Sequence, residues 1–149
     1  MPVSNTRVIP ARTRGFVRDQ CWCLHVQRAA RVLARRFDEA LRPVGLNNGQ
    51  FSLLMALSQP EPTSIGAIAT LLSMDRTTLT ANLKPLERRR LVKIAIDPRD
   101  RRGRLLSLTP LGLTALRAAL PIWKRTQKQV EQQLEAVSVD LRRALRALH

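Results

Sequence analysis

Residues 76–90 carry side chains that can contact the edges of DNA bases if the stretch is a helix. Its polar or small side chains would then share one broad face, and these are Arg76, Thr77, Thr80, Ala81, Lys84 and Arg88. Leu79, Leu83 and Leu86 would point to the opposite side. Guanidinium, hydroxyl and ammonium groups on a helix fit the donor and acceptor pattern of the DNA major groove. An amphipathic surface helix has the same pattern, so a second feature is needed to identify a site.

A basic turn follows in the sequence DPRDRRG at residues 97–103. A turn requires residues such as Asp, Pro and Gly, but its stability does not require three arginines. We expect Asp97 and Asp100 to pair with neighbouring arginine side chains and to stiffen the loop, which leaves at least one guanidinium free. A free arginine on a narrow projecting loop fits the DNA minor groove and its phosphates. The helix and the basic turn together indicate a two-part DNA-binding surface.

The sequence CWCLH at residues 21–25 is the third group of chemically active residues. In a helix, Cys21 and His25 lie one turn apart, whereas Cys23 points to another side. A metal ion would need a further ligand, and the only other histidine is His149. We therefore predict no metal site and no cofactor. Nearby arginines favour a reactive thiol at Cys23, and the alternative is that Cys23 is a small core residue, as free cysteines commonly are.

Apolar periodicity and turn residues predict the elements that position these groups. A pattern of apolar residues three and four positions apart predicts a helix over residues 17–41, which Pro43 and Gly45 end. Two β-type runs, residues 91–96 and 104–109, flank the basic turn and predict a hairpin. The other helices are expected at residues 48–57, 65–73, 76–90, from Pro110 onward and at 139–148.

Capping residues support three of these helices. The residues just before a predicted helix are Asn47 or Asn48, Asp75 and Thr109. Pro110 then suits the first position of its helix. Pro85 lies inside the helix over residues 76–90 and is expected to bend it or to end it early. Residues 1–15 have no apolar period and are expected to form a basic N-terminal arm.

The composition favours a polyanionic partner. The 149 residues have a formal net charge of +15. With three Phe, two Trp and no Tyr, the chain has few aromatic rings on which single-stranded nucleic acid could stack. Two histidines and the lack of a glycine-rich phosphate loop argue against an enzyme. The sequence shows neither an apolar run of membrane-spanning length nor a secretory signal, so we expect a cytoplasmic protein without a membrane partner.

The sequence resembles the MarR family of bacterial regulators over about residues 26–123. The resemblance rests on FSLLMAL at 51–57, on IGAIATLLSMDRTTLTANLKPLERRRLVKI at 65–94 and on DPRDRRGRLLSLTPLG at 97–112. It implies a mainly α-helical winged helix-turn-helix with a small β-hairpin wing, and a homodimer whose interface is built from the N- and C-terminal helices. The implied organisation is a single domain at residues 16–149, with dimerisation helices at 16–46 and 110–149 and a DNA-binding lobe at 47–109.

The resemblance also implies roles for individual residues. The side chains that it places near the major groove are Arg76, Thr77, Thr78, Thr80 and Lys84. Asp97 and Asp100 would brace the wing. The arginines that would enter the minor groove are Arg99, Arg101 or Arg102.

Regulators of this family respond to small aromatic or anionic ligands, to metals or to oxidants. The residues expected to line a ligand pocket between the dimerisation helices and the lobe are Trp22, Cys23, His25, Leu54, Met55 and Trp123, and each is as readily a core residue. In the branch that senses organic peroxides, a reactive cysteine stands at the position of Cys23, which together with Cys21 is our candidate sensor. That branch orients its thiol with tyrosines, where this chain has Gln27 and Phe37.

These observations predict a sequence-specific regulator of transcription that binds double-stranded DNA, with repression as the expected effect. The DNA site would be pseudo-palindromic, with half-sites about one helical turn apart. The alternative is a sequence-independent architectural DNA-binding protein. Such a protein would use the same basic surface and would show little preference among DNA sequences.

Overall fold

The computed structural model describes residues 8–149 of the chain, so residues 1–7 of the expected basic arm lie outside the described part. The first helices are α1 (Ala11–Gln20) and α2 (Trp22–Leu41). The structure differs from two expectations here. A helix already begins at Ala11, inside the expected arm. The single helix predicted over residues 17–41 is interrupted at Cys21, because this residue has an extended backbone with φ −73° and ψ 105°.

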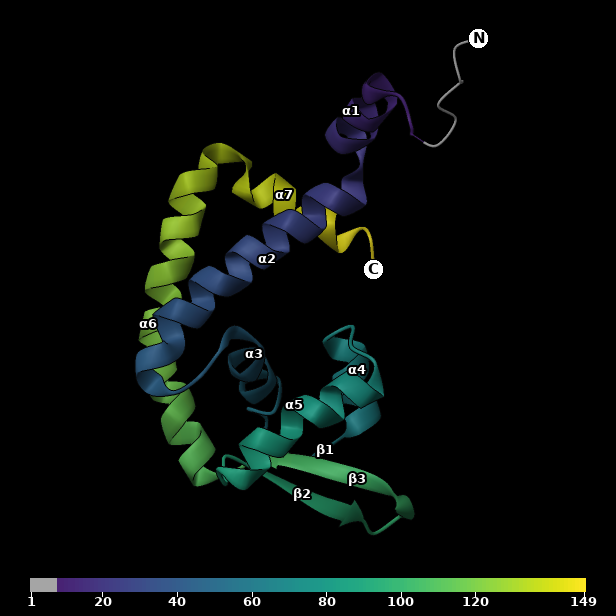
Figure 1. Cartoon of the computed structure of the whole chain (residues 1–149). Coiled ribbons are helices and arrows are strands. Elements are labelled where there is room, and N and C mark those ends of the chain that lie inside the picture. The colour runs from purple at the N-terminus through teal and green to yellow at the C-terminus, as the bar shows by residue number, and fades with distance from the viewer. Residues whose placement is uncertain (1–7) are drawn as a thin grey trace. The chain divides into compact units, whose positions relative to one another are not determined.

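The chain divides after Arg35 into two compact units, so α2 belongs in part to each. The larger unit contains the remaining helices and all strands of the described residues (Figure 1). Its elements after α2 are η1 (Arg42–Val44), α3 (Asn48–Ala56), β1 (Thr63–Ser64), α4 (Ile65–Leu71), α5 (Arg76–Arg88), β2 (Val92–Asp97), β3 (Asp100–Leu108), α6 (Pro110–Leu134), η2 (Glu135–Val137) and α7 (Ser138–Arg146). Every helix among residues 8–149 is too short or too polar to cross a membrane.

Side-chain caps begin α3, α5 and α6. Asn47 and Gln50 form a capping box at the start of α3, in which each side chain accepts a hydrogen bond from the other residue's backbone N–H. Asp75 caps α5 and Thr109 caps α6, whose first residue is Pro110. The predicted caps are confirmed, and Asn47 rather than Asn48 is the cap of α3.

The three strands form an antiparallel sheet in the order β1-β3-β2. β2 and β3 are the predicted hairpin, which begins with Val92 opposite Leu108. The hairpin extends further than predicted, because Asp97 pairs with Asp100 and residues 100–103 belong to β3 rather than to the turn. Strand β1 was not predicted, since a strand of two residues is too short to show an alternating pattern.

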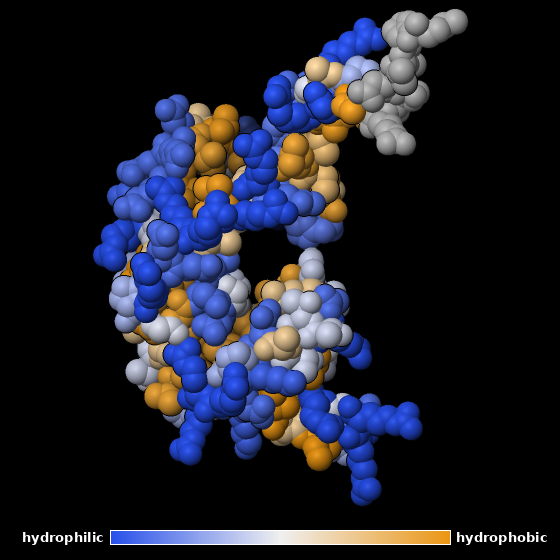
Figure 2. All heavy atoms as spheres, viewed as in Figure 1, coloured by the Kyte–Doolittle hydropathy of each residue, from blue (hydrophilic) through white to orange (hydrophobic). Residues whose placement is uncertain are grey.

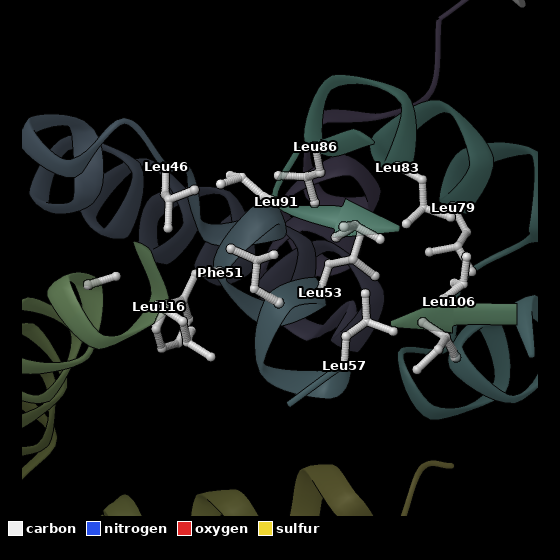
Figure 3. Packing of buried hydrophobic residues seen from close by; sticks show 14 of the residues in the cluster. Leu46, Phe51, Leu53, Leu57, Leu79, Leu83, Leu86, Leu91, Leu106 and Leu116 are labelled. Carbon is white, nitrogen blue, oxygen red and sulfur yellow. The ribbon is translucent and has the colours of Figure 1, made fainter. Parts of the chain in front are cut away.

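A hydrophobic core holds α3, α4, α5 and the first part of α6 against the sheet (Figure 3). From α5 it receives Leu79, Leu83 and Leu86, each at most 1% exposed. The other fully buried large side chains are Leu41, Leu53, Leu54, Leu57, Ile68 and Leu106. Burying one such side chain stabilises the fold by about 2 kcal/mol. The three leucines of α5 therefore determine how this helix is rotated about its axis.

Helix α5 continues through Pro85 to Arg88, so the proline does not end the helix as one of our expectations had it. The buried Leu83 and Leu86 on either side of the proline hold this part of the helix against the core. The chain then turns at Arg90, which has a left-handed φ of 57°. The N–H of Leu91 donates to the carbonyl of Leu86 at 2.9 Å and so closes the helix end.

Helix α6 packs on α3, and aromatic rings lie at their contact. The Trp123 ring stacks on Phe51 with a centroid distance of 5.7 Å and an interplanar angle of 15°. After α6 the chain turns at Glu135, which has a φ of 51°. Arg142 of α7 donates from Nη1 to Glu131 Oε1 of α6 at 3.0 Å, so the last helix is tied to α6 by an ion pair.

Candidate nucleic-acid interface

The outward face of α5 carries the side chains expected to contact DNA. Arg76, Thr77, Thr78, Thr80 and Lys84 are all exposed, and the apolar residues of the helix face the core. The predicted division of α5 into a polar and an apolar side is confirmed. The contact of these five side chains with DNA stays a prediction.

Hydrogen bonds within α5 limit what two of its threonines can offer to a ligand. Thr78 Oγ1 donates to Asp75 Oδ2 at 2.6 Å, and Thr80 Oγ1 donates to the carbonyl oxygen of Arg76 at 2.8 Å. Both hydroxyls therefore keep only their acceptor lone pairs. These can accept from the amino group of adenine or cytosine but cannot donate to a phosphate.

The cap of α5 also changes the acidity of Asp75. The hydrogen bond from the Thr78 hydroxyl, followed by the one from the Thr78 backbone N–H, lowers the pKa of the Asp75 carboxyl below its ordinary value. A carboxylate at the start of a helix is further favoured by the helix dipole. The charged form of Asp75 is thus the form that holds the first turn of α5.

We expect acid to weaken this cap. Because the pKa of Asp75 is lower in the folded state, its stabilisation is present above the unfolded pKa of about 3.9 and is lost as the pH falls through the folded value. Between about pH 5 and pH 2, the Tm of Asp75→Asn should fall less than the wild-type Tm, as followed by circular dichroism. Glu61→Gln removes an exposed carboxylate that lies outside the helices and takes part in none of the ion pairs among the described residues, so its Tm should depend on pH as that of wild type does. Equal acid sensitivity of Asp75→Asn and wild type would contradict this account.

The wing is the hairpin of β2 and β3. Two aspartates brace the wing by accepting hydrogen bonds from its backbone. Asp97 Oδ1 accepts from the N–H of Arg99 at 2.9 Å, and Asp100 Oδ1 accepts from the N–H of Arg102 at 3.0 Å. The expectation that these carboxylates pair with arginine side chains is wrong, since none of the ion pairs within residues 8–149 includes a wing residue. The short Asp side chain instead reaches the N–H two residues further along.

A bulge at the start of β3 shapes the tip of the wing. The register shifts between Ile96, which pairs with Arg104, and Asp97, which pairs with Asp100. Residues 101–103 of β3 therefore have no partner on β2. A Cβ on Gly103 would lie 3.1 Å from the Asp100 carbonyl oxygen and 3.1 Å from Asp97 Cβ, so a glycine allows the hairpin to close here.

The wing exposes four arginines, Arg99, Arg101, Arg102 and Arg104. In Figure 2, hydrophilic side chains project from the tip of the hairpin. Arg104 is different, because its Nη1 donates to the carbonyl oxygens of Arg101 at 3.2 Å and Gly103 at 3.0 Å. Sequence reasoning did not single out Arg104, whose only signal was its place in an arginine-rich run.

A hollow lies between the wing and the beginnings of α4 and α5. Its lining includes Arg76 from α5 and Arg102 and Arg104 from the wing, together with Asp97 and Asp100. The hollow thus brings together the two halves of the predicted surface. Gly66 of α4 also lines it, and the sequence carried no signal that would have singled out this glycine.

The two cysteines are free, Cys21 being partly buried and Cys23 exposed. Gln27 Nε2 donates to Cys23 Sγ at 3.1 Å, and Arg31 Nη2 donates to Gln27 Oε1 at 3.2 Å. Cys21 Sγ accepts only from the backbone N–H of Leu24, at 3.4 Å, among the described residues. In the protomer Cys23 is therefore not a core residue, and an arginine polarises the amide that contacts its sulfur.

The residues expected to line a ligand pocket differ in their surroundings. Trp22 is 84% exposed and His25 is also exposed. Leu54 is fully buried in the core, so the expectation that it lines a pocket is wrong for this structure. Met55 and Trp123 line an apolar groove between α3, α4 and α6. Among residues 8–149, no three side chains of His, Cys, Asp or Glu gather in a way that could hold a metal ion.

The structure and sequence are similar to those of known transcriptional regulators. Residues 46–103 match the model of the MarR family. The transcriptional regulator MosR of M. tuberculosis, solved in complex with DNA, matches with a TM-score of 0.80 and 36% identity over 87% of this chain and 93% of that one. A mutant of E. coli MarR complexed with operator DNA matches with a TM-score of 0.79 over 89% of this chain and 96% of that one. Its identity of 21% shows a likeness of fold alone.

A curated relative matches a shorter stretch. The transcriptional activatory protein BadR of Rhodopseudomonas palustris is 35% identical over 86 residues. This stretch covers 56% of the present chain and 49% of BadR, so the match spans about half the length of that relative.

Proposed function

Because the chain belongs to the MarR family of transcriptional regulators, we propose that it binds double-stranded DNA sequence-specifically as a homodimer. In this proposal α5 lies in the major groove and the wing reaches the adjacent minor groove. The family and the fold are those of transcriptional regulators and not of enzymes. MosR, the similar regulator with 36% identity, was solved in complex with DNA.

One observation carries this proposal. The exposed polar face of α5 and the arginine-rich wing belong to one compact unit. Arg76 of the helix meets Arg102 and Arg104 of the wing at one hollow. The core leucines determine the rotation of α5, and the two aspartates brace the wing. Both halves of the surface are thus held before DNA binds, which lowers the entropic cost of binding.

Exposed apolar side chains at both ends of the chain support a homodimer. Within residues 16–35 they are Phe16, Val17, Trp22, Val26, Val32 and Leu33. Near the C-terminus they are Val137, Val139, Leu141, Leu145 and Leu148. Groups of exposed apolar side chains of this kind mark interaction surfaces. A second copy that covers them would build the interface from the helices within residues 16–46 and 110–149.

The proposal is tested by titrating the protein onto the DNA upstream of its own gene and following fluorescence anisotropy. We expect two chains per duplex and a strong preference over a shuffled duplex. The affinity should fall steeply with salt, with a log–log slope of about 0.9 for each phosphate that is neutralised. Equal binding to both duplexes would favour an architectural protein, and no binding at low salt would exclude the proposed function.

We propose repression as the regulatory effect, because a dimer bound over a promoter excludes the polymerase. A reporter gene behind the bound promoter should be expressed more strongly after deletion of the gene for this protein. Lower expression after deletion would instead make the protein an activator, as its relative BadR is named.

Two routes of release from DNA fit the structure. A small aromatic or anionic ligand could bind in the apolar groove that Met55 and Trp123 line. Alternatively, a hydroperoxide could oxidise Cys23. In that step the sulfur anion attacks one oxygen of the O–O bond and becomes S–OH, while the other oxygen leaves and takes up a proton as an alcohol. The Gln27 amide donates to the sulfur at 3.1 Å and so orients it.

The second route predicts a difference between the two cysteines. An organic hydroperoxide should release DNA from wild type and from Cys21→Ser, but not from Cys23→Ser, because only Cys23 is exposed and contacts Gln27. Release is measured as the loss of anisotropy of a preformed complex. If Cys23→Ser releases DNA as wild type does, thiol oxidation at this residue is excluded and the ligand route remains.

A further inference from the structure

We propose that Gly66 is a positioning residue for DNA binding, because its lack of a side chain leaves the space in which the Arg76 guanidinium lies. The inference rests on the proposed function. Gly66 is the second residue of α4, and Arg76 is the first residue of α5. Both line the hollow beside the wing. The ligand group assigned to this hollow is a phosphate of the DNA backbone.

The geometry shows what a side chain at position 66 would meet. A Cβ on Gly66 would lie 3.0 Å from Arg76 Nη2 and 3.8 Å from Arg76 Cζ. Carbon and nitrogen atoms in comfortable contact are about 3.5 Å or more apart. The Ser64 Oγ atom, at 3.9 Å, is in ordinary contact. A methyl group would therefore crowd the guanidinium and little else among the described residues.

The backbone gives no other reason for a glycine at this position. Gly66 lies inside a helix, and its φ is not in the left-handed region that favours glycine. Alanine is the better helix former, so local helix stability alone favours alanine over glycine. The long side chain of Arg76 is exposed and can move away from a methyl group at no cost to the core. The expected effect of the methyl group is thus on the position of Arg76 and not on the fold.

The position of Arg76 matters because of where the hollow lies. Arg76 stands at the N-terminal end of α5, and Arg102 and Arg104 approach the same hollow from the wing. The carboxylates of Asp97 and Asp100 in its lining already accept backbone N–H groups. A backbone phosphate that passes from the major groove to the minor groove would meet the guanidinium of Arg76 there.

A double-mutant cycle tests this role. We expect Gly66→Ala to weaken operator binding about fivefold and Arg76→Ala about tenfold. Because Gly66 acts through Arg76, Gly66→Ala should have no further effect in the Arg76→Ala background. The matched control is Gly49→Ala, also at the second position of a helix, where the new Cβ would lie 3.5 Å from Asn47 Oδ1. It should leave the Kd unchanged, and neither glycine substitution should lower the Tm.

A measurement without DNA separates this inference from the proposed function. The NMR order parameter of the Arg76 Nε–Hε group in the free protein should be lower in Gly66→Ala than in wild type. If wild type binds no operator, the proposed function fails, and the order parameter still decides whether Gly66 positions Arg76. If Gly66→Ala has the same operator affinity and the same Arg76 order parameter as wild type, the inference is overturned. The inference is also overturned if Gly66→Ala weakens binding as much in the Arg76→Ala background as in wild type, because Gly66 would then act through the fold and not through Arg76.

Discussion

Replacing Arg99, Arg101 and Arg102 together by alanine is expected to weaken operator binding by about 100-fold or more. In a dimer the substitution removes three exposed guanidinium groups from each wing and leaves Lys93 and Arg104 in place. The bracing of the wing should survive, because the aspartates accept from the backbone N–H groups of Arg99 and Arg102, which alanine retains. The Tm should therefore stay close to the wild-type value. The measurements are fluorescence anisotropy over a range of salt concentrations and a thermal scan.

The matched control removes the same charge from another surface. Arg117, Lys124 and Arg125 are exposed residues of α6 and lie outside the wing. Their replacement by alanine should change operator affinity by less than about threefold and should leave the salt slope unchanged. Light scattering checks that both triple variants have the same oligomeric state. An equal loss of affinity in the two variants would show that overall charge and not the wing determines binding.

Gly112→Ala is expected to destabilise the protein by about 3 kcal/mol, which corresponds to a fall in Tm of about 10 °C. A Cβ on the buried Gly112 would overlap the carbonyl oxygen of Leu91 and would lie 2.8 Å from Leu108 Cδ1. The Leu91 carbonyl cannot easily move, because it accepts hydrogen bonds from the backbone N–H of Thr109 at 3.1 Å and from Thr109 Oγ1 at 3.1 Å. The added methyl group must therefore push α6 away from the turn after α5.

The direction of the change in Tm distinguishes packing from helix propensity. Helix propensity alone would make Gly112→Ala stabilising. Gly49→Ala is again the control, since its new Cβ would make only an ordinary contact, and it should keep or raise the Tm. Both variants are scanned at the same protein concentration, because the Tm of a dimer depends on concentration. A wild-type Tm for Gly112→Ala would contradict the close approach of α6 to Leu91.

Much of the DNA-binding lobe could be predicted from local patterns. The leucines of α5 recur at helical spacing, so they predicted which side of the helix faces the core. The caps at Asp75 and Thr109 follow from side chains that reach the N–H three residues further along. The β2–β3 hairpin follows from two β-type runs around a turn. Each of these signals depends only on residues close together in the chain.

Other features could not be predicted in this way. Strand β1 exists because Thr63 and Ser64 pair with Leu106 and Leu105 of β3. Two residues are too few to show a pattern that would predict this pairing. From the sequence, the wing carboxylates could accept from guanidinium groups or from backbone N–H groups. The closed hairpin places the backbone N–H groups of Arg99 and Arg102 within hydrogen-bond distance. The burial of Leu54 likewise follows from what packs around it and not from its type.

By itself, the sequence determined the helices of the lobe, their caps, the two sides of α5 and the basic character of the wing, because periodicity and capping act over a few residues. Only the tertiary structure decided which groups meet across the fold. The approach of Gly112 to Leu91 and the placement of the Arg76 guanidinium over Gly66 both join separate elements. So does the hollow that Arg76 shares with the wing. Such contacts depend on distances between packed elements, to within a fraction of an ångström, and no local pattern of residues encodes those distances.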